Sequence, residues 1–417
     1  MASQLALVGP DHRQTQEDLA EISGRFIAPS GKLLAIDAND PARVIAALLA
    51  PELREADLIL VRDWAPLDEA ALTNLGVAEA MDENGIVRII SERKATATGG
   101  IWLQTSGTTG PPKLVRHDRE RLQGRIRQPI TEGPARWMLT YHPGSFAGLQ
   151  VLLTAFPSGQ PIVYADRAKL ASLSNFPADE LPTCISATPT YWRAMLSALG
   201  ATVQQFPIEI ATLGGEIADQ PVLDLLAATF PTAKITHVYA ATELGVILSV
   251  SDRLAGFPES WLDAEREIKV TVRDGMLFVQ SPFAAGQTVR AGSSVDAEFA
   301  GNWTGTGDLV EIRDGRVFFM GREDSVINVG GQKVFAEDIE QILQRHPAVR
   351  DIRIYAVPNP ILGTAVAADV VLEGDDLAGL KTFAREHLSR LQIPVKWNVL
   401  DTLEMNAAGK KTRKATP

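Results

Sequence analysis

Short apolar segments alternate with segments of helical apolar spacing over the first half of the chain. The pattern predicts strands at residues 58–61, 101–104, 161–164, 184–187 and 208–213, and helices at 41–53, 67–81, 148–156, 191–199 and 220–230. Strands that are separated by helices are joined by crossovers rather than by tight turns, so they pair in parallel. The alternation therefore predicts an α/β fold in which helices cover parallel sheets.

The pattern changes near residue 268, where short β-branched segments are separated by glycine and aspartate. This pattern predicts an antiparallel, β-rich subdomain, which completes a large N-terminal domain over residues 1–323. Residues 324–417 contain two predicted helices and two predicted strands, enough for a small α+β C-terminal domain with its own core. The charged turn at 323–325 is the expected boundary between the two domains.

The charge balance limits which partners the protein is expected to bind, and the cysteine count indicates in which compartment it is found. Forty basic and fifty-one acidic side chains give a net charge of -11, which argues against nucleic acid or an anionic membrane surface as a partner. Cys184 is the only cysteine, so an intramolecular disulfide is excluded and a reducing compartment is favoured. No signal peptide and no uninterrupted apolar run of membrane-spanning length is present. We expect a cytoplasmic protein without a membrane span.

One segment combines the residue types that a phosphate-binding loop needs. It follows the predicted strand at 101–104 and reads Thr105-Ser106-Gly107-Thr108-Thr109-Gly110-Pro111-Pro112-Lys113. Its glycines let the backbone approach a ligand closely, its hydroxyls can donate hydrogen bonds, and its lysine adds a positive charge. Such a turn after a strand forms a nest for phosphate oxygens. The pattern G-x-x-x-x-G-K-[ST] is absent, so the segment is not a Walker loop.

Six segments in chain order resemble the motifs of the adenylate-forming superfamily, which comprises acyl-CoA synthetases, nonribosomal adenylation domains and luciferases. They are the loop above, Leu-Gly-Gly-Glu at 213–216, Tyr-Ala-Ala-Thr-Glu at 239–243, a segment ending in Thr-Gly-Asp at 303–308, the segment 321–334, and Gly-Lys-Lys-Thr-Arg-Lys at 409–414. The resemblance implies a ligase that uses ATP to convert a small carboxylic acid into an acyl-adenylate. A thiol then takes up the acyl group.

The resemblance also implies which residues hold the nucleotide. They are Thr105, Ser106, Gly107, Thr108, Thr109, Gly110, Lys113, Gly214, Gly215, Glu216, Tyr239, Ala240, Thr242, Asp308 and Arg322. Tyr239 would stack on adenine, and Asp308 and Arg322 would hydrogen-bond the ribose or the α-phosphate side. Glu243 would hold Mg²⁺ on the triphosphate. Lys410 would neutralise charge during adenylation, so the catalytic residues are Lys410, Thr108 and Glu243.

The nature of the acid is less well determined by the sequence. Residues 141–149 contain no aspartate or glutamate, so the ammonium of an α-amino acid would be buried without a partner, and such a substrate is disfavoured. The expected acyl pocket is lined by His142, Phe146, Trp192, Leu213 and Ala241. Core packing is an equally good interpretation for the apolar members of this set, and a hydrogen bond to a polar substituent is one role for His142.

The acceptor is expected to be coenzyme A or the phosphopantetheine arm of a separate acyl carrier protein, with Gly330, Gly331 and Lys333 at its binding site. The resemblance implies that the C-terminal domain is mobile and rotates between the half-reactions, with Asp324 as hinge. Two departures from the motifs, Ala240 in place of the usual glycine and a short segment before Thr105, leave a non-catalytic nucleotide-binding homologue as an alternative.

Overall fold

The computed structural model describes residues 5–9, 13–26, 33–65, 67, 69–75, 77–82, 87–90, 99–105, 113–123, 126, 131–156, 159–165, 167–285, 287–290 and 301–403. Contacts between residues group the chain into two compact units. Unit one comprises residues 1–216, 225–253 and 280–303, and unit two comprises residues 217–224, 254–279 and 304–417. None of the helices within the described ranges is long and apolar enough to cross a membrane.

A seven-stranded sheet in unit one carries the strand before the phosphate loop. Its order is β18 (Gln287–Arg290), β8 (Lys113–Asp118), β7 (Gly100–Thr105), β4 (Asp57–Val61), β3 (Leu33–Asp37), β5 (Glu79–Met81) and β6 (Val87–Ile89). The four strands from β7 to β5 are parallel, and β8 and β6 are antiparallel additions. Every residue of β3 and β4 is buried, as expected for parallel strands covered on both faces.

An eight-stranded sheet forms the second layer of unit one. Its order is β14 (Gly245–Val250), β13 (Lys234–Ala241), β12 (Ile210–Gly214), β11 (Cys184–Ala187), β9 (Trp137–Leu139), β10 (Ile162–Tyr164), β1 (Leu5–Val8) and β2 (Arg13–Thr15). The six strands from β13 to β1 are parallel, while β14 and β2 are antiparallel at the two edges. The predicted parallel pairing of strands separated by helices is confirmed.

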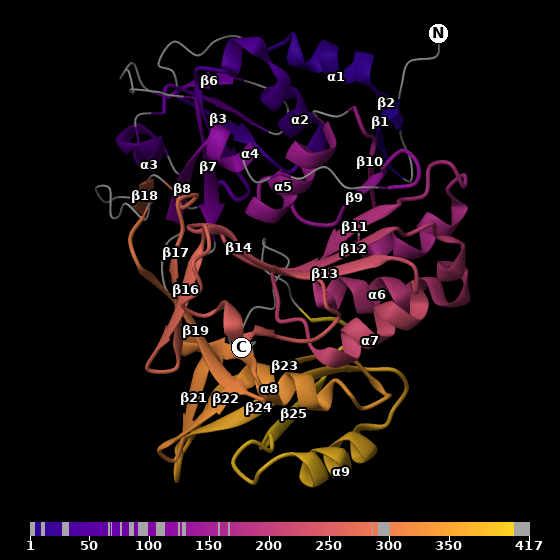
Figure 1. Cartoon of the computed structure of the whole chain (residues 1–417), viewed down its shortest axis with the longest axis vertical. Helices are drawn as coiled ribbons and strands as arrows, with labels where there is room; N and C mark the ends of the chain where they lie inside the picture. Colours follow the sequence, from indigo (N-terminus) through magenta and orange to yellow (C-terminus); the bar gives the residue numbers. More distant parts are fainter. Residues whose placement is uncertain are drawn as a thin grey trace. The chain divides into compact units, whose positions relative to one another are not determined.

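One hydrophobic core joins both sheets through helices α1 (Gln16–Ser23), α2 (Pro41–Leu49), α4 (Arg119–Gln123) and α5 (Phe146–Ala155) (Figure 1). A second core lies on the other face of the seven-stranded sheet and includes Leu72 of α3 (Glu69–Asn74). Helices α6 (Pro189–Leu199) and α7 (Gln220–Thr229) follow β11 and β12 in the chain. Helices between two sheets leave the carboxyl ends of the parallel strands as the place for a ligand.

The helix starts are set by side chains that accept a hydrogen bond from a backbone N–H in the first turn. Ser145 caps α5 by accepting from Gly148, and Thr188 caps α6 by accepting from Tyr191. The oxygen of each side chain satisfies an N–H that has no partner within the helix. These caps position the start of α5 after β9 and the start of α6 after β11.

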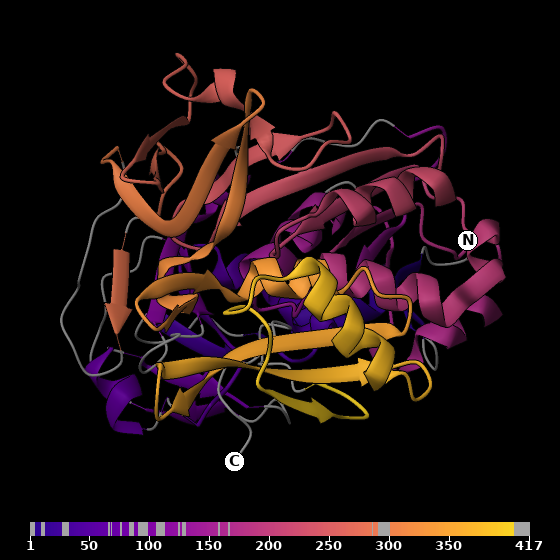
Figure 2. The ribbon, with the colours of Figure 1, turned by 90° about the horizontal axis from the view of Figure 1, so that it is seen from below.

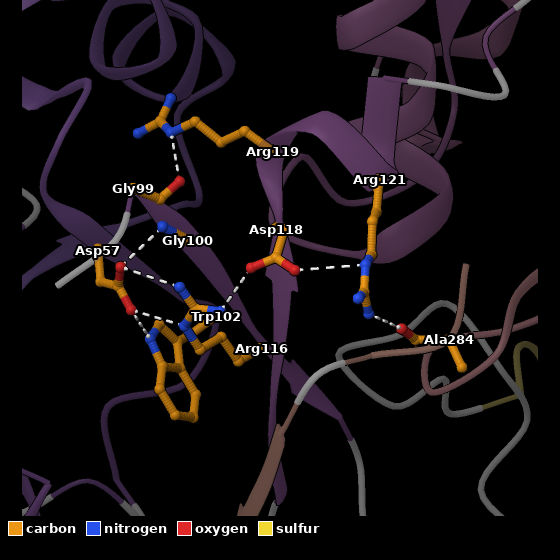
Figure 3. A network of polar contacts seen from close by, with 9 residues as sticks. All are labelled: Asp57, Gly99, Gly100, Trp102, Arg116, Asp118, Arg119, Arg121 and Ala284. Atoms are coloured by element: carbon orange, nitrogen blue, oxygen red, sulfur yellow. Dashed lines mark hydrogen bonds and ion pairs between the residues drawn. The ribbon is translucent and has the colours of Figure 1, made fainter. Parts of the chain in front are cut away.

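A buried polar network ties the strands around β7 together (Figure 3). Asp57 accepts hydrogen bonds from Arg116 Nε at 2.9 Å, Gly100 N at 2.7 Å and Trp102 Nε1 at 2.9 Å. Burial would raise the pKa of the Asp57 carboxyl, but these donors outweigh it and hold the pKa below its usual value. The network therefore fixes the register of β4, β7 and β8, and the last two of these strands flank the predicted phosphate loop.

The described residues of unit two form three sheets. The first has the order β15 (Phe257–Pro258), β20 (Arg316–Arg322), β19 (Thr304–Arg313), β17 (Met276–Gln280) and β16 (Lys269–Arg273). The second pairs β21 (Val326–Val329) with β22 (Gln332–Phe335), and the third has the order β23 (Val349–Asn359), β24 (Gly363–Leu372) and β25 (Lys396–Val399). The helices α8 (Ala336–Leu343) and α9 (Leu377–His387) share a core with the third sheet (Figure 2).

The third sheet contains a buried ion pair. Arg353 of β23 and Asp369 of β24 are cross-strand partners, and both side chains are 1% exposed. Their guanidinium and carboxylate are in direct contact. Asp369 also accepts hydrogen bonds from Tyr355 Oη at 3.0 Å and Asn398 Nδ2 at 2.7 Å. All the acceptor capacity of this carboxylate is used within the sheet.

Three predicted helices end earlier in the structure than the sequence indicates. The segment 41–53 is α2 followed by a 3-10 turn from Pro51, because proline has no N–H to continue the helix. In the described part of the segment 67–81 the one helix is the short α3, and the last residues form β5, which pairs with β3. The apolar spacing over 377–391 predicts one helix, but α9 ends at His387, and the following residue, Leu388, has an extended backbone.

Candidate functional site

The predicted phosphate loop begins and ends on paired strands. Thr105, the last residue of β7, is the cross-strand partner of Lys113, the first residue of β8, and its Oγ1 donates to the Lys113 carbonyl at 3.4 Å. The intervening residues, including the predicted ligands Ser106, Gly107, Thr108, Thr109 and Gly110, lie outside the described part of the chain. The sheet thus fixes both ends of the loop at the carboxyl end of a parallel strand.

The segment expected to line the adenine pocket follows β12. Gly214 is the last residue of that strand, and its carbonyl accepts a hydrogen bond from Tyr141 Oη at 3.1 Å. Gly215 has a φ of +82°, a backbone conformation that favours glycine. The carboxylate of Glu216 accepts from the backbone N–H of Thr190, in the first turn of α6, at 3.1 Å. Glu216 therefore has a structural contact, and its nucleotide-binding role stays a prediction.

The Tyr-Ala-Ala-Thr-Glu element forms the end of β13 and the turn into β14. A bulge separates Tyr239 from Ala240, and Ala241 pairs with Gly245 at the end of the hairpin. Thr242 and Glu243 occupy the turn and are half-buried. The carbonyl of Glu243 accepts from Ala285 N at 2.7 Å, so the backbone of the turn is held, and no described residue hydrogen-bonds the carboxylate.

His117 of β8 makes a second hydrogen bond to the backbone of this turn. Its Nε2 lies 2.7 Å from the Thr242 carbonyl, and a carbonyl only accepts, so Nε2 carries the proton. Burial lowers the pKa of His117 to about 4, so the ring is neutral at neutral pH. The bond joins the strand after the phosphate loop to the turn that carries Glu243. Sequence reasoning missed this residue, because its partner is distant in the chain and no motif marks it.

Replacing His117 by alanine should impair the turn that presents Glu243. The Thr242 carbonyl would lose its donor, and we expect the rate of acid-dependent pyrophosphate exchange to fall roughly 10- to 100-fold, a typical cost of removing an outer-shell partner. The Mg²⁺ concentration for half-maximal exchange should rise at the same time. His117→Gln, which can still donate, should recover part of both values.

The matched control for this experiment is His387→Ala, which removes an exposed histidine from α9. Titration of exchange against Mg²⁺ at saturating ATP gives both quantities. A fall in thermal stability with an unchanged Mg²⁺ dependence would mean that His117 only supports the fold.

His142 is enclosed by hydrogen bonds in the structure. Its Nδ1 accepts from Gly144 N at 3.0 Å, and its Nε2 lies 2.9 Å from Asn39 Oδ1. Burial and then the charge of Arg62 lower the pKa of His142 to about 4, so this ring is also neutral. Because both ring nitrogens are engaged, a direct hydrogen bond from His142 to a substrate requires one of these bonds to break.

The other predicted acyl-pocket residues fall into two groups. Trp192 and Leu213 have no exposed surface, and the Trp192 indole donates to the Thr212 carbonyl at 3.0 Å, an arrangement typical of core residues. Phe146, at the start of α5, is only partly buried. It lines a small cavity with His117, Arg121, Leu122, Gln150, Gly245, Val246 and Phe283. The pocket roles of all five residues, His142, Phe146, Trp192, Leu213 and Ala241, stay predictions.

The predicted ribose-binding residues lie in unit two on the hairpin of β19 and β20. Asp308 and Arg322 are cross-strand partners, with Arg322 Nη1 at 3.8 Å from Asp308 Oδ1. Gly307 has a φ of +75°, and a Cβ there would lie 3.2 Å from Arg322 Nη2. Glycine at this position therefore lets the guanidinium approach the backbone beside Asp308.

The predicted acceptor loop is a tight hairpin turn between β21 and β22. Gly330 and Gly331 have φ values of +57° and +87°, the pair of positive values that a type I′ turn requires. Gly330 N donates to the Leu362 carbonyl at 3.2 Å, and Lys333 is exposed on β22. Asp324 lies in the 3-10 turn Glu323–Ser325 that precedes β21. Lys410 lies outside the described residues.

Comparison with known families gives two matches. The model of the AMP-binding enzyme family matches residues 46–270, and the model of the AMP-binding enzyme C-terminal domain matches residues 338–410. The first match contains the phosphate-loop segment and the Tyr-Ala-Ala-Thr-Glu element, and the second ends at Lys410.

Individual proteins show the same likeness. The chain is 28% identical to 2-succinylbenzoate–CoA ligase of Bacillus subtilis (strain 168), over 76% of this chain and 68% of that protein. It is 26% identical to 4-chlorobenzoate–CoA ligase of an Arthrobacter species, over 74% of this chain and 64% of that protein.

Solved structures show the same fold. The o-succinylbenzoate CoA synthetase of Bacillus subtilis in complex with its acyl-adenylate intermediate has a TM-score of 0.72 at 21% identity, covering 99% of this chain and 94% of that one. The same synthetase in complex with ATP and magnesium ion has a TM-score of 0.70 at 22% identity, covering 99% and 96%. The predicted fold class, a large mixed α/β part followed by a smaller C-terminal domain, is confirmed.

Proposed function

The chain belongs to the AMP-binding enzyme family, and from this premise we propose that it joins a carboxylic acid to coenzyme A by way of an acyl-adenylate. In the first step a carboxylate oxygen attacks the α-phosphorus of ATP, and the bond to pyrophosphate breaks. In the second step the sulfur of coenzyme A attacks the acyl carbon, and AMP leaves. The observation that carries the proposal is the joint match of both family models, with the six motifs in order within or beside them.

The two anionic substrates repel each other, so the site must supply positive charge and hydrogen-bond donors. Lys113, at the end of the loop whose ends the sheet fixes, is one such charge, and Lys410 is proposed as the other. Tyr239, on the strand that leads to the Thr-Glu turn, is proposed to stack on adenine. Asp308 and Arg322 are proposed to bind the ribose.

Glu243 fits a magnesium ion bound to the triphosphate. Its carboxylate is half-buried at the end of a hairpin whose backbone is held by His117 and Ala285. Among the described residues, no three His, Cys, Asp or Glu side chains gather into a metal cluster. A single carboxylate suits Mg²⁺, which keeps most of its ligands from phosphate and water, and the ion supplies charge stabilisation at the phosphates.

Glu243→Gln should reduce Mg²⁺-dependent pyrophosphate exchange on the order of 10²-fold, because it removes a charge and keeps the shape of the side chain. The melting temperature should stay within error, since the contacts of this turn run through the backbone. The control is Glu120→Gln, an exposed glutamate of α4. An unchanged Mg²⁺ dependence in Glu243→Gln would rule out the metal-ligand role.

Coenzyme A is the acceptor that the comparisons favour, because the relatives named above are CoA ligases. A separate carrier protein, the other acceptor considered from the sequence, receives no support from them. The hinge at Asp324, the domain boundary beside it, and the acceptor contacts of Gly330, Gly331 and Lys333 are parts of this proposal that rest on the motifs alone.

The experiment that tests the proposal is ATP–pyrophosphate exchange with a panel of aromatic, aliphatic, mono- and dicarboxylic acids and the standard amino acids. We expect exchange with acids that lack an α-ammonium and AMP formation when coenzyme A is added. Measurable ATP binding without exchange for any acid would favour the non-catalytic alternative. Preference for an amino acid over its deaminated analogue would contradict the inference from residues 141–149.

A further inference from the structure

Arg62 is a half-buried cation that the roles assigned above do not use. It follows β4 directly, at the carboxyl end of a parallel strand, and its Nη1 donates to the Gln104 carbonyl at 3.3 Å. Its Nε and Nη2 are buried and have no hydrogen-bond partner among the residues that the structure describes. Burial lowers the pKa of this guanidinium below its usual value.

The carboxylates near Arg62 are already occupied. Asp37 receives Arg43 Nη1 at 3.2 Å, Trp64 Nε1 at 3.0 Å and Asn39 Nδ2 at 2.9 Å. The next residue, Asp63, is exposed, and its carboxylate accepts from Ala65 N. Among the described residues, the guanidinium of Arg62 therefore has no ion-pair partner.

The two unused nitrogens have a specific geometry. Nε and Nη2 lie on the same edge of a guanidinium, and this edge presents two parallel donors to the two oxygens of one carboxylate. Other arginines among the described residues use this edge: Arg13 binds Glu180, Arg116 binds Asp57 and Arg353 binds Asp369 through Nε and Nη2. In Arg62 the same edge is buried and unpaired.

Arg62 lies beside the segment where the acyl pocket is proposed, and this position favours a role toward the acid rather than toward adenine. Its charge acts on the ring of His142, and a Cβ at Gly144 would lie 3.1 Å from Arg62 Cγ. Gly144 and His142 belong to the segment that leads into α5 and precedes Phe146, where the acyl pocket is proposed. Because His142 is neutral and both its ring nitrogens are engaged, Arg62 rather than His142 is able to recognise an anion beside this segment.

We propose that Arg62 pairs through Nε and Nη2 with a second anionic group of the acid, so that the substrate is a dicarboxylic acid or an acid with another anionic substituent. The proposal rests on the proposed function and adds a substrate class to it. An unpaired buried cation is costly in the free protein, and the substrate removes this cost by supplying the missing carboxylate. Acids without the second charge leave the guanidinium unpaired and bind more weakly.

The test compares Arg62→Gln and Arg62→Lys with the wild type, using 2-succinylbenzoate, its analogue with a carboxamide in place of the second carboxylate, and 4-chlorobenzoate. Pyrophosphate exchange gives kcat/KM for each acid and KM for ATP, and calorimetry gives the affinity for each acid without ATP. We expect Arg62→Gln to lower kcat/KM and affinity for the diacid on the order of 10- to 100-fold, the range for a hydrogen-bonded charge. The amide, the monoacid and ATP should be nearly unaffected, and Arg62→Lys should retain part of the preference.

Thermal unfolding separates recognition from a role in the fold. Arg62→Gln removes a buried unpaired charge, so its melting temperature should equal or exceed that of the wild type, and Arg54→Gln serves as the exposed control. The proposal would be overturned if Arg62→Gln lowered kcat/KM equally for the diacid and the amide, or if the wild type preferred the monoacid. It would also be overturned if Arg62→Gln raised KM for ATP, and this result would assign Arg62 to the triphosphate. A wild type that exchanges with no acid of the wider panel would instead refute the proposed function, and calorimetry with the diacid would still decide the pairing.

Discussion

Lys410→Ala is expected to lose acyl-adenylate formation by a factor on the order of 10²–10³, while thioester formation from supplied acyl-adenylate continues at close to the wild-type rate. The ammonium is proposed to neutralise the charge that develops when the acid attacks ATP, and this charge is absent from the second half-reaction. Pyrophosphate exchange measures the first step, and release of AMP from acyl-adenylate and coenzyme A measures the second.

Lys411→Ala is the matched control, because it removes a neighbouring charge from the same basic segment. It should leave both half-reactions within a few-fold of the wild type. If Lys410→Ala slowed both steps equally, the lysine would serve the structure of the C-terminal segment rather than the chemistry of adenylation.

Asp369→Ala should destabilise the third sheet of unit two by about 3–5 kcal/mol, the usual cost of leaving one member of a buried ion pair alone. Arg353 would remain buried without its carboxylate, and Tyr355 and Asn398 would lose their shared acceptor. Native-state hydrogen exchange at the backbone amides of β23 and β24 measures this loss where it occurs. The same amides should become the fastest to exchange among the described strands of unit two.

Two comparisons show whether the charge itself is responsible. Asp375→Ala removes an exposed carboxylate from the same unit and should change exchange little. The double substitution Arg353→Met with Asp369→Leu removes both charges and should recover most of the lost stability. A double variant as unstable as Asp369→Ala would show that shape, rather than an unpaired charge, dominates this site.

The sequence predicted those parts of the fold that depend on local pattern. Apolar runs bounded by turn residues marked β4, β11 and β12, and helical spacing marked α5, α6 and α7. The error at 67–81 arose because residues with helical spacing pair with β3 and form β5, a choice made by a strand distant in the sequence. The apolar period predicts a helix up to residue 53, but α2 ends at Leu49, because Pro51 has no N–H with which to continue it.

For the site, prediction succeeded where the residues form a motif and failed where they meet only in space. The loop ending at Lys113 and the turn containing Glu243 are readable because each motif is continuous in the chain. His117 contacts Thr242, which is 125 residues away in the chain. Arg62 stands out because its Nε and Nη2 have no hydrogen-bond partner among the described residues. Such features depend on tertiary packing, so no pattern within the sequence marks them.

The neutral state of His117 and His142 affects how a pH–rate profile of this enzyme should be interpreted. Histidine normally changes charge near neutrality, yet both rings have a pKa of about 4 and remain uncharged throughout the physiological range. The hydrogen bonds that His117 makes at the Thr-Glu turn and that His142 makes before α5 therefore stay the same as the pH changes from slightly acidic to slightly alkaline. Neither ring gains a charge in this range. A titration observed in that range would therefore report a group other than His117 and His142, such as the attacking thiol.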